Sequence, residues 1–119
     1  MAMTYDDVRA FALALPGVAE GTSYGQASLK AHGKFLTRLK EDGDTLVLPG
    51  VGFDERDMLI AAEPETFYLT DHYRNHPYVL VRLSRVEPGT VTGLLERHWR
   101  ATAPRRLLKA HDLQGGTAA

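Results

Sequence analysis

The first hydrophobic pattern along the chain is that of an amphipathic helix. Four apolar residues recur at intervals of three and four positions: Val8, Phe11, Ala12 and Leu15. This spacing places them on one face of a helix. Thr4 and Asp7 stand where a capping box closes a helix N-terminus, and Pro16-Gly17 ends the pattern. We therefore predict a helix near the N-terminus whose apolar stripe covers another part of the fold.

From residue 29 the period changes to that of a β-strand. Residues 29–32 and 34–40 alternate between apolar and polar positions on either side of Gly33, which predicts a hairpin. An Asp-Gly pair at 42–43 favours a second tight turn, and residues 45–48 follow as a third strand. The first half of the chain therefore predicts an antiparallel meander.

The second half predicts a short helix, two strands and a longer helix. Asp54 is the expected N-cap of the short helix. The apolar side of this helix is Met58, Leu59 and Ala62. Residues 66–70 and 78–83 are rich in strand-forming side chains, and the second run is apolar on both faces, as in an interior strand. The longer helix follows Pro88, and its apolar side is Val91, Leu94, Leu95, His98, Trp99 and Thr102.

The order of these elements, α-β-β-β-α-β-β-α with an optional final helix at 105–112, predicts an α+β domain. We expect a two-layer sandwich in which an antiparallel sheet of about five strands carries the helices on one face and leaves the other partly open. This single domain covers residues 1–112. Residues 113–119 include a Gly/Ala-rich end and are expected to form a flexible tail.

Composition excludes several chemistries. The 119 residues contain no cysteine, which removes disulfides, Cys-ligated zinc, iron–sulfur clusters and thiol catalysis. The N-terminus is acidic, and no apolar run approaches the roughly 20 residues that span a bilayer. We therefore expect a cytoplasmic protein without membrane contact, with no cofactor, that is a monomer or a small homo-oligomer.

Candidate catalytic residues are few. His72 and His76 are four positions apart, but Pro77 disfavours the helical geometry that would let them chelate a metal, and no third histidine lies nearby. None of the serines stands in a Gly-x-Ser-x-Gly motif: Ser23, Ser28 and Ser84. We therefore expect no metal site and no enzymatic activity.

The polar side of the predicted hairpin is a better candidate for a functional surface. The net charge is −1, yet residues 1–70 hold 6 Lys/Arg against 11 Asp/Glu and the remainder 8 against 4, so local basic patches are possible. If Phe35 and the other apolar positions face the core, alternation turns the hairpin cations toward solvent together. These are Lys30, His32, Lys34, Arg38 and Lys40, and Arg105 and Arg106 could extend the patch. Such a ribbon fits a phosphate backbone, although similar charges often only solvate a sheet.

Several segments, in this order and spacing, resemble the MmcQ/YjbR family of small bacterial proteins. They are Leu-Ala-Leu-Pro-Gly-Val at 13–18, Thr-Asp-His-Tyr at 70–73, Pro-Tyr-Val-Leu-Val-Arg-Leu at 77–83 and Ala-Pro-Arg-Arg-Leu at 103–107. The resemblance implies a YjbR-like α+β sandwich similar to frataxin-like or secretion-chaperone-like folds. Because members are often labelled DNA-binding for a double-wing shape, it also implies DNA as a partner. The residues of the family-motif loop and the strand after it are His72, Tyr73, Pro77, Tyr78 and Arg82.

Two functions follow from these observations. The first is DNA binding through the hairpin cations, which predicts salt-sensitive binding to a duplex. The second is a non-catalytic scaffold that binds a protein or a small molecule through the open sheet face and the loop from Tyr68 to Tyr78. It predicts an exposed aromatic patch or a pocket near Tyr73 and Tyr78.

Overall fold

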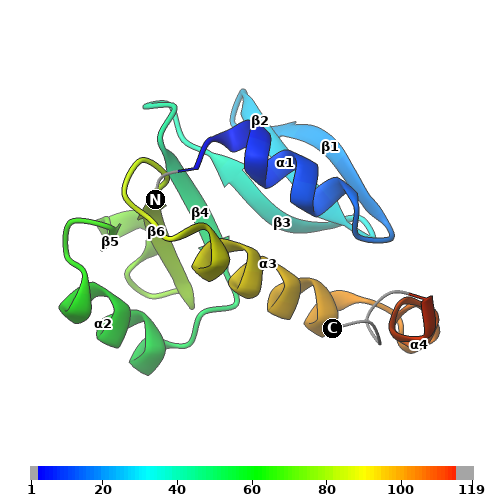
Figure 1. Ribbon diagram of the computed structural model, residues 1–119. Helices are drawn as coiled ribbons and strands as arrows, with labels where there is room; N and C mark the ends of the chain where they lie inside the picture. The colour runs from blue at the N-terminus through cyan, green and yellow to red at the C-terminus, as the bar shows by residue number, and fades with distance from the viewer. Residues whose placement is uncertain (1–2, 115–119) are drawn as a thin grey trace.

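A computed structural model describes residues 3–114, which form a six-stranded antiparallel sheet and four α-helices (Figure 1). The elements in chain order are α1 (Tyr5–Leu13), β1 (Val18–Ser23), β2 (Gln26–Ala31), β3 (Lys34–Leu39), β4 (Thr45–Pro49), α2 (Phe53–Ala62), β5 (Phe67–Tyr68), the 3₁₀ turn η1 (Asp71–Tyr73), β6 (Tyr78–Arg82), α3 (Pro88–Thr102) and α4 (Arg105–Gln114). The strands are arranged in the sheet as β1-β2-β3-β4-β6-β5. The predicted α+β class and antiparallel sheet are confirmed.

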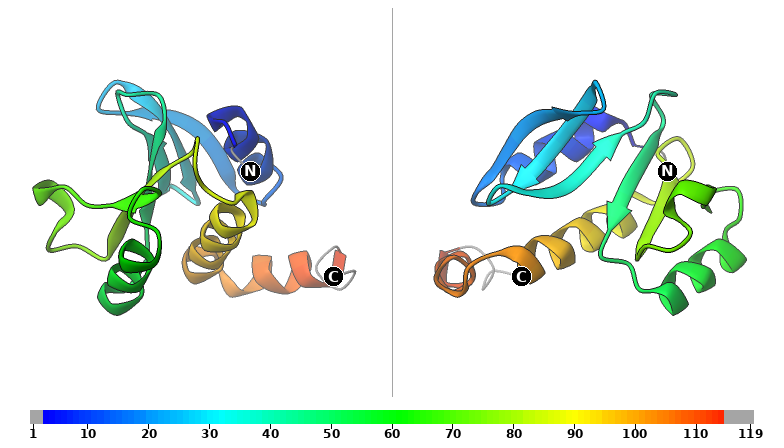
Figure 2. Two further views of the ribbon diagram at one scale, coloured as in Figure 1. Left: turned by 60° about the vertical axis from the view of Figure 1, so that its left-hand side comes forward. Right: turned by 180° about the vertical axis from the view of Figure 1, so that it is seen from behind.

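The main core lies between the sheet and the helices α1, α2 and α3, which cover the same face (Figure 2). The strands contribute buried leucines and valines from alternate positions, and the helices contribute their apolar sides. Trp99 of α3 is fully buried there, and its indole N–H donates to the Pro16 carbonyl at 2.8 Å. The predicted stripe of α3 is confirmed by the burial of Val91, Leu95 and Trp99.

The N-terminal helix begins with the predicted capping box. The Thr4 amide donates to the Asp7 carboxylate at 2.9 Å, and the Asp7 amide donates to the Thr4 hydroxyl at 3.3 Å. Val8 and Ala12 are buried on the inner side of this helix. The short helix α2 departs from the prediction, because Gly52 is its N-cap and Asp54 lies in its first turn without capping it.

The side of α2 that faces the core also differs from the predicted one. Met58 is 64% exposed, whereas Leu59 and Ile60 pack against the core. The apolar residues of this helix do not form a single stripe, so periodicity gave a weak indication of which side would be buried.

Two strands differ from the sequence prediction. The edge strand β1 was not predicted, because its residues are exposed or half-buried throughout and leave no alternating pattern. The strand expected at 66–70 is reduced to the two residues of β5, which pair with Val81 and Leu80 of β6. The neighbouring strand β6 is interior, as its two-sided apolar pattern indicated, because it lies between β4 and β5.

A β-bulge between β2 and β3 changes the faces of the hairpin. Leu29 is paired with Thr37, but Lys30 is paired with Phe35, so that Leu36 is the extra residue. Paired residues share a face. Phe35 therefore lies on the open side with Lys30, while Leu36 is buried on the helix side. The expectation that Phe35 faces the main core is wrong, because the extra residue shifts the alternation by one position.

The C-terminal helix α4 includes residues 113 and 114, which had been assigned to the tail; the remainder of the predicted tail, 115–119, lies outside the described residues. Among residues 3–114, none of the helices has both the length and the apolar character needed to cross a membrane.

Candidate functional site

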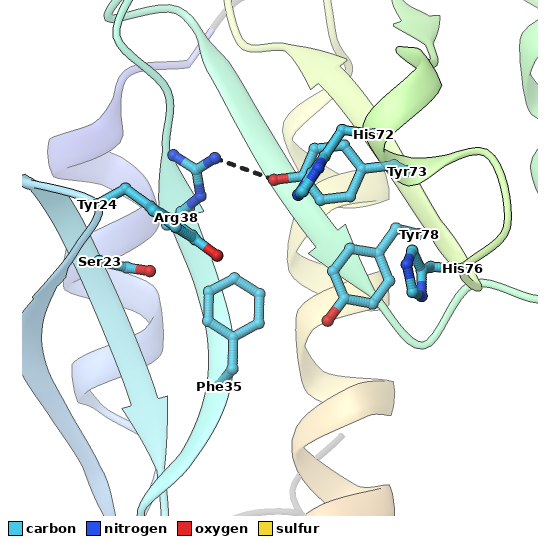
Figure 3. A pocket seen from close by; sticks show the side chains of 8 residues that line it. All are labelled: Ser23, Tyr24, Phe35, Arg38, His72, Tyr73, His76 and Tyr78. Carbon is cyan, nitrogen blue, oxygen red and sulfur yellow. Dashed lines mark hydrogen bonds between the residues drawn. The ribbon is translucent and has the colours of Figure 1, made fainter.

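The face of the sheet opposite α1, α2 and α3 carries a second, smaller cluster of buried side chains. The loop that connects β5 to β6 folds over this face and places Tyr73 against Val47 and Leu80. Beside this cluster lies a pocket of about 250 Å³. Its walls, drawn in Figure 3, are Ser23, Tyr24, Phe35, Arg38, His72, Tyr73, His76 and Tyr78. The pocket thus joins the β1–β2 turn, β3 and the β5–β6 loop.

Aromatic rings form most of the wall. Tyr78 stacks on Tyr73 with ring centroids 5.5 Å apart, and it is nearly parallel to Phe35 at 6.3 Å. The imidazoles of His72 and His76 lie 4.7 and 6.0 Å from the Tyr73 and Tyr78 rings, respectively. Such spacings are those of favourable aromatic pairs. The rings therefore support one another as a continuous surface.

The shape of the sheet leaves room for the pocket. The paired positions of β3 and β4 are only Arg38 with Val47 and Leu39 with Leu46. Toward Phe35 the two strands are no longer paired, so the apolar ring of Phe35 stands at the edge of an open space rather than against a neighbouring strand. Because the bulge has turned Phe35 to this face, the pocket depends directly on the local register of the hairpin.

Arg56 of α2 fixes the loop that forms the other side of the pocket. This residue is only 7% exposed, and its Nη1 donates to the carbonyls of Arg74 and His76 at 3.0 Å each. The Val51 amide also donates to the Pro77 carbonyl at 2.9 Å. These bonds supply the loop carbonyls with donors from outside the loop, and the His76 carbonyl also accepts from the Tyr78 amide at 2.8 Å. The α2 region therefore holds the Tyr73 and Tyr78 rings in place.

Arg38 is the charged group of the pocket. It is 6% exposed, and its Nη2 donates to the Tyr73 hydroxyl at 3.0 Å (Figure 3). Its Nη1 is buried and has no hydrogen-bond acceptor among the described residues. The carboxylate of Glu41 lies 3.6 Å from Nη1, too far for a hydrogen bond, and this side chain is 67% exposed. The ring of Tyr24 lies 5.0 Å from the guanidinium carbon.

A second hollow of about 410 Å³ adjoins the first. Its lining residues are Tyr24, Arg38, Lys40, Glu41 and His72, three of which also line the aromatic pocket. The ammonium of Lys40 lies 5.8 Å from the centre of the Tyr73 ring. An aromatic hollow and a charged hollow therefore meet at Arg38.

Burial raises the pKa of the Tyr78 hydroxyl above its usual value, and the nearby Tyr73 and Tyr24 hydroxyls add to the rise. The phenol is therefore neutral at physiological pH. It offers one donor and its lone pairs to a ligand, with no negative charge.

The structure does not bring the predicted hairpin cations together on one solvent face. Lys30 and Lys40 reach the open side, but Arg38 is buried. His32 packs over Gly17 and lies 6.3 Å from Trp99 on the helix side. Arg38 lies on the same face as Lys30 but is covered by Tyr73 of the β5–β6 loop, and the turn at His32 directs that side chain to the helix side.

The remaining cations lie elsewhere. Lys34 is paired with Ala31, whose side chain belongs to the helix-side core. Arg105 and Arg106 are exposed on α4, which follows α3 on the helix side (Figure 2). The continuous patch expected from the sequence is therefore not formed, while the role of these residues in binding stays a prediction.

Some of the family-motif residues line the pocket, and the others make contacts outside it. His72, Tyr73 and Tyr78 line the pocket, and Pro77 accepts a hydrogen bond through its carbonyl. The guanidinium of Arg82 lies 4.1 Å from the centre of the Tyr68 ring. Among residues 3–114, no three histidine or carboxylate side chains are arranged to hold a metal ion.

Sequence reasoning missed the contributions of Ser23 and Tyr24 to the pocket. Tyr24 is 80% exposed and has a positive φ of 54°, next to Gly25 at 75°. Two successive residues with positive φ are typical of a tight hairpin turn. The Tyr-Gly pair was thus a detectable turn, but its position opposite Arg38 depends on tertiary structure.

Comparison with known proteins is consistent across sequence and structure. The YjbR family model matches residues 13–101. Uncharacterized proteins of Mycobacterium bovis and Mycobacterium tuberculosis are 30% identical to the chain over 127 residues, and each match covers 95% of this chain and 98% of the relative. The crystal structure of Deinococcus radiodurans protein DR2400, a DUF419 domain, superposes with a TM-score of 0.69 at 22% identity, covering 97% of this chain and 89% of that one.

Proposed function

The chain belongs to the YjbR family, and we propose that it is a non-catalytic binding module that takes a small aromatic ligand into the pocket on the open face of its sheet. The observation that supports this proposal is the set of stacked rings that remain accessible beside Arg38. Aromatic side chains that pack only for stability lie within a core, whereas Phe35 and Tyr78 are half-buried at the edge of a cavity.

The dimensions and chemistry of the pocket favour a small, flat ligand. A volume of about 250 Å³ lies close to the lower end of ligand-binding cavities, which begin at about 300 Å³. One or two fused rings would fit beside Tyr78 and Phe35, where offset stacking adds to the burial of apolar surface. The loop that leads into Tyr78 is anchored by Arg56, so little ordering is needed when the ligand binds.

The lining groups support binding more than catalysis. His72 and His76 both reach the pocket, but no carboxylate lines it to orient either imidazole. Both rings instead lie against tyrosines. A pocket of apolar rings with one cationic group is suited to recognition.

DNA binding is a second candidate, supported by a different observation. Lys30 and Lys40 are on the same side of the sheet as Phe35 and Tyr24. Cations beside exposed rings are the combination that binds single-stranded nucleic acid. Glu41 stands within this surface, and the whole chain has a net charge of −1. These charges make a small ligand the better-supported occupant.

A titration with the neutral compound 1-naphthamide, followed by ¹⁵N NMR, tests the small-ligand proposal. We expect the perturbed amides to cluster at Phe35, Arg38 and residues 72–78. Tyr78→Leu should weaken binding by roughly two- to tenfold, the usual contribution of an aromatic pair. Met58→Ala, at an exposed apolar position on α2, is the matched control and should leave binding unchanged. No saturable shifts, or shifts centred on α2, would contradict the proposal.

A further inference from the structure

We infer that the ligand of the pocket is an aromatic carboxylate, whose ring enters the aromatic hollow while its anionic group binds Arg38 and Lys40 in the adjoining hollow. This inference rests on the proposed function and specifies the class of ligand. It arises from Arg38, whose charge is buried at the junction of the two hollows and is only partly paired.

The partial pairing of Arg38 is unusual for a buried cation. Buried charges are normally paired and hydrogen-bonded, because desolvation is costly. Here Nη2 has one neutral partner, the Tyr73 hydroxyl, and the buried Nη1 has none among residues 3–114. Arg38 lines both hollows. A ligand anion would therefore supply the partner that Nη1 lacks.

Neighbouring groups also favour an anion at this point. The Tyr73 hydroxyl accepts a hydrogen bond from Arg38, so its own proton is available to a further acceptor. Lys40 lines the same hollow and contributes a second positive charge. A carboxylate beside Arg38 would thus meet donors from a guanidinium and a phenol, and the bonds to the guanidinium are of the stronger, charge-assisted kind.

The carboxylate of Glu41 would compete with a ligand anion for the position beside Arg38. This carboxylate lies 3.6 Å from Nη1 of Arg38 and makes no hydrogen bond within the described part of the chain. Because this side chain is mostly exposed, it can turn toward water at little cost. Its negative charge should weaken binding of a ligand anion, so removal of that charge should strengthen it.

The charges favour a single small anion over a nucleic-acid strand. A strand would present a row of phosphates, yet the charged hollow offers Arg38 and Lys40 together with the opposing Glu41. Arg105 and Arg106, which could have extended the cationic surface, lie on α4 on the other side of the sheet. One carboxylate joined to one ring system matches one cationic hollow joined to one aromatic hollow.

The test compares 1-naphthoate with 1-naphthamide, two ligands of nearly the same shape that differ in charge. Binding is measured by NMR titration of the full chain. We expect the naphthoate to bind about tenfold more tightly, the usual difference made by a hydrogen bond to a charged group. Arg38→Gln should bring the ratio of the two affinities close to one. Lys40→Gln should lower it by roughly twofold to fivefold.

Two further variants complete the experiment, one as a test and one as a control. Glu41→Gln should raise the affinity for naphthoate, by roughly twofold to fivefold, without changing that for naphthamide. Lys109→Gln removes an exposed charge on α4 and should leave both affinities unchanged. Because Arg38 is buried, its variant is checked for folding by circular dichroism. The comparison of the two ligands on the unmodified protein and the Glu41→Gln variant both test the inference without altering the buried Arg38.

The possible failures can be told apart. Equal binding of the two naphthalenes, with shifts in the pocket, would overturn the inference while leaving the proposed function in place. Binding of neither would overturn both. A single-stranded oligothymidylate that binds more tightly than naphthoate and loses affinity in Arg38→Gln would replace the carboxylate with a nucleic-acid partner.

Discussion

Arg56 connects α2 to the loop that forms one side of the pocket, so its replacement by methionine perturbs the stability and the site together. Nη1 of Arg56 donates to the carbonyls of Arg74 and His76, and the guanidinium is almost fully buried. Methionine keeps a long apolar side chain in this position but provides no donor. The Arg74 carbonyl then depends on water, while the His76 carbonyl keeps the Tyr78 amide as its donor.

The expected loss of stability can be worked out from these contacts. Each hydrogen bond from a charged donor contributes about 1.5–3 kcal/mol. Because Arg74 and His76 are exposed, water can reach their carbonyls, and the lower value applies to each bond, giving about 3 kcal/mol for the two. Removing a buried charge offsets part of this loss. We expect Arg56→Met to lower the free energy of unfolding by about 2 kcal/mol.

Urea unfolding measures this change, with Arg85→Met as the matched control. Arg85 is exposed in the turn after β6, and its replacement should change stability by less than about 0.5 kcal/mol. The amides of residues 71–76 should also shift in the ¹⁵N spectrum of Arg56→Met, and affinity for naphthamide should fall. If Arg56→Met were as stable as Arg85→Met, Arg56 would not hold the loop and this part of the account would be wrong.

Three further predictions concern the helix-side core. Gly50 and Gly43 both have a φ of 74°, but of the two only Gly50 lies where an added Cβ would clash with another side chain, at Nδ1 of His98. In thermal unfolding, Gly50→Ala should therefore cost about 1 kcal/mol or more beyond Gly43→Ala; equal costs would contradict the predicted clash. Burial lowers the pKa of His98 below 6.5, so its stabilisation is present above that pH and is lost as the pH falls through the folded pKa. In urea unfolding, the free energy of unfolding of His98→Gln should depend less on pH in this acidic range. An unchanged pH dependence would show that His98 does not contribute to it. Trp99→Phe removes the donor to Pro16 and should cost about 1–3 kcal/mol in urea unfolding, whereas wild-type stability would show that the bond contributes little.

The elements with a buried side were predictable because burial imposes a period on the sequence. The helices α1 and α3 and the interior strand β6 each showed their pattern clearly. The edge strand β1 has no buried side and therefore no such pattern. One local sign of the bulge was present, because Leu36 occupied a position expected to be polar. A shift of one residue at this point explains both its burial and the exposure of Phe35 to the pocket.

The candidate site was only partly predictable. The aromatic loop near Tyr73 and Tyr78 was identified as a candidate surface, and a pocket is present there. The cationic patch was not formed, because the bulge turns Lys34 to the helix side and the β5–β6 loop covers Arg38 with Tyr73. The partial pairing of Arg38 depends on Tyr73, 35 positions away in the chain. A contact of this kind leaves no local pattern, since it is set by the packing of the loop on the sheet.

A crystal structure of the protein with 1-naphthoate would show directly where the ligand binds. We expect its rings to lie against Phe35 and Tyr78, and its carboxylate to lie within hydrogen-bond distance of Nη1 of Arg38 with Glu41 turned toward solvent. A naphthoate bound only elsewhere on the surface, with the pocket empty and Nη1 of Arg38 still without an acceptor, would contradict this binding mode.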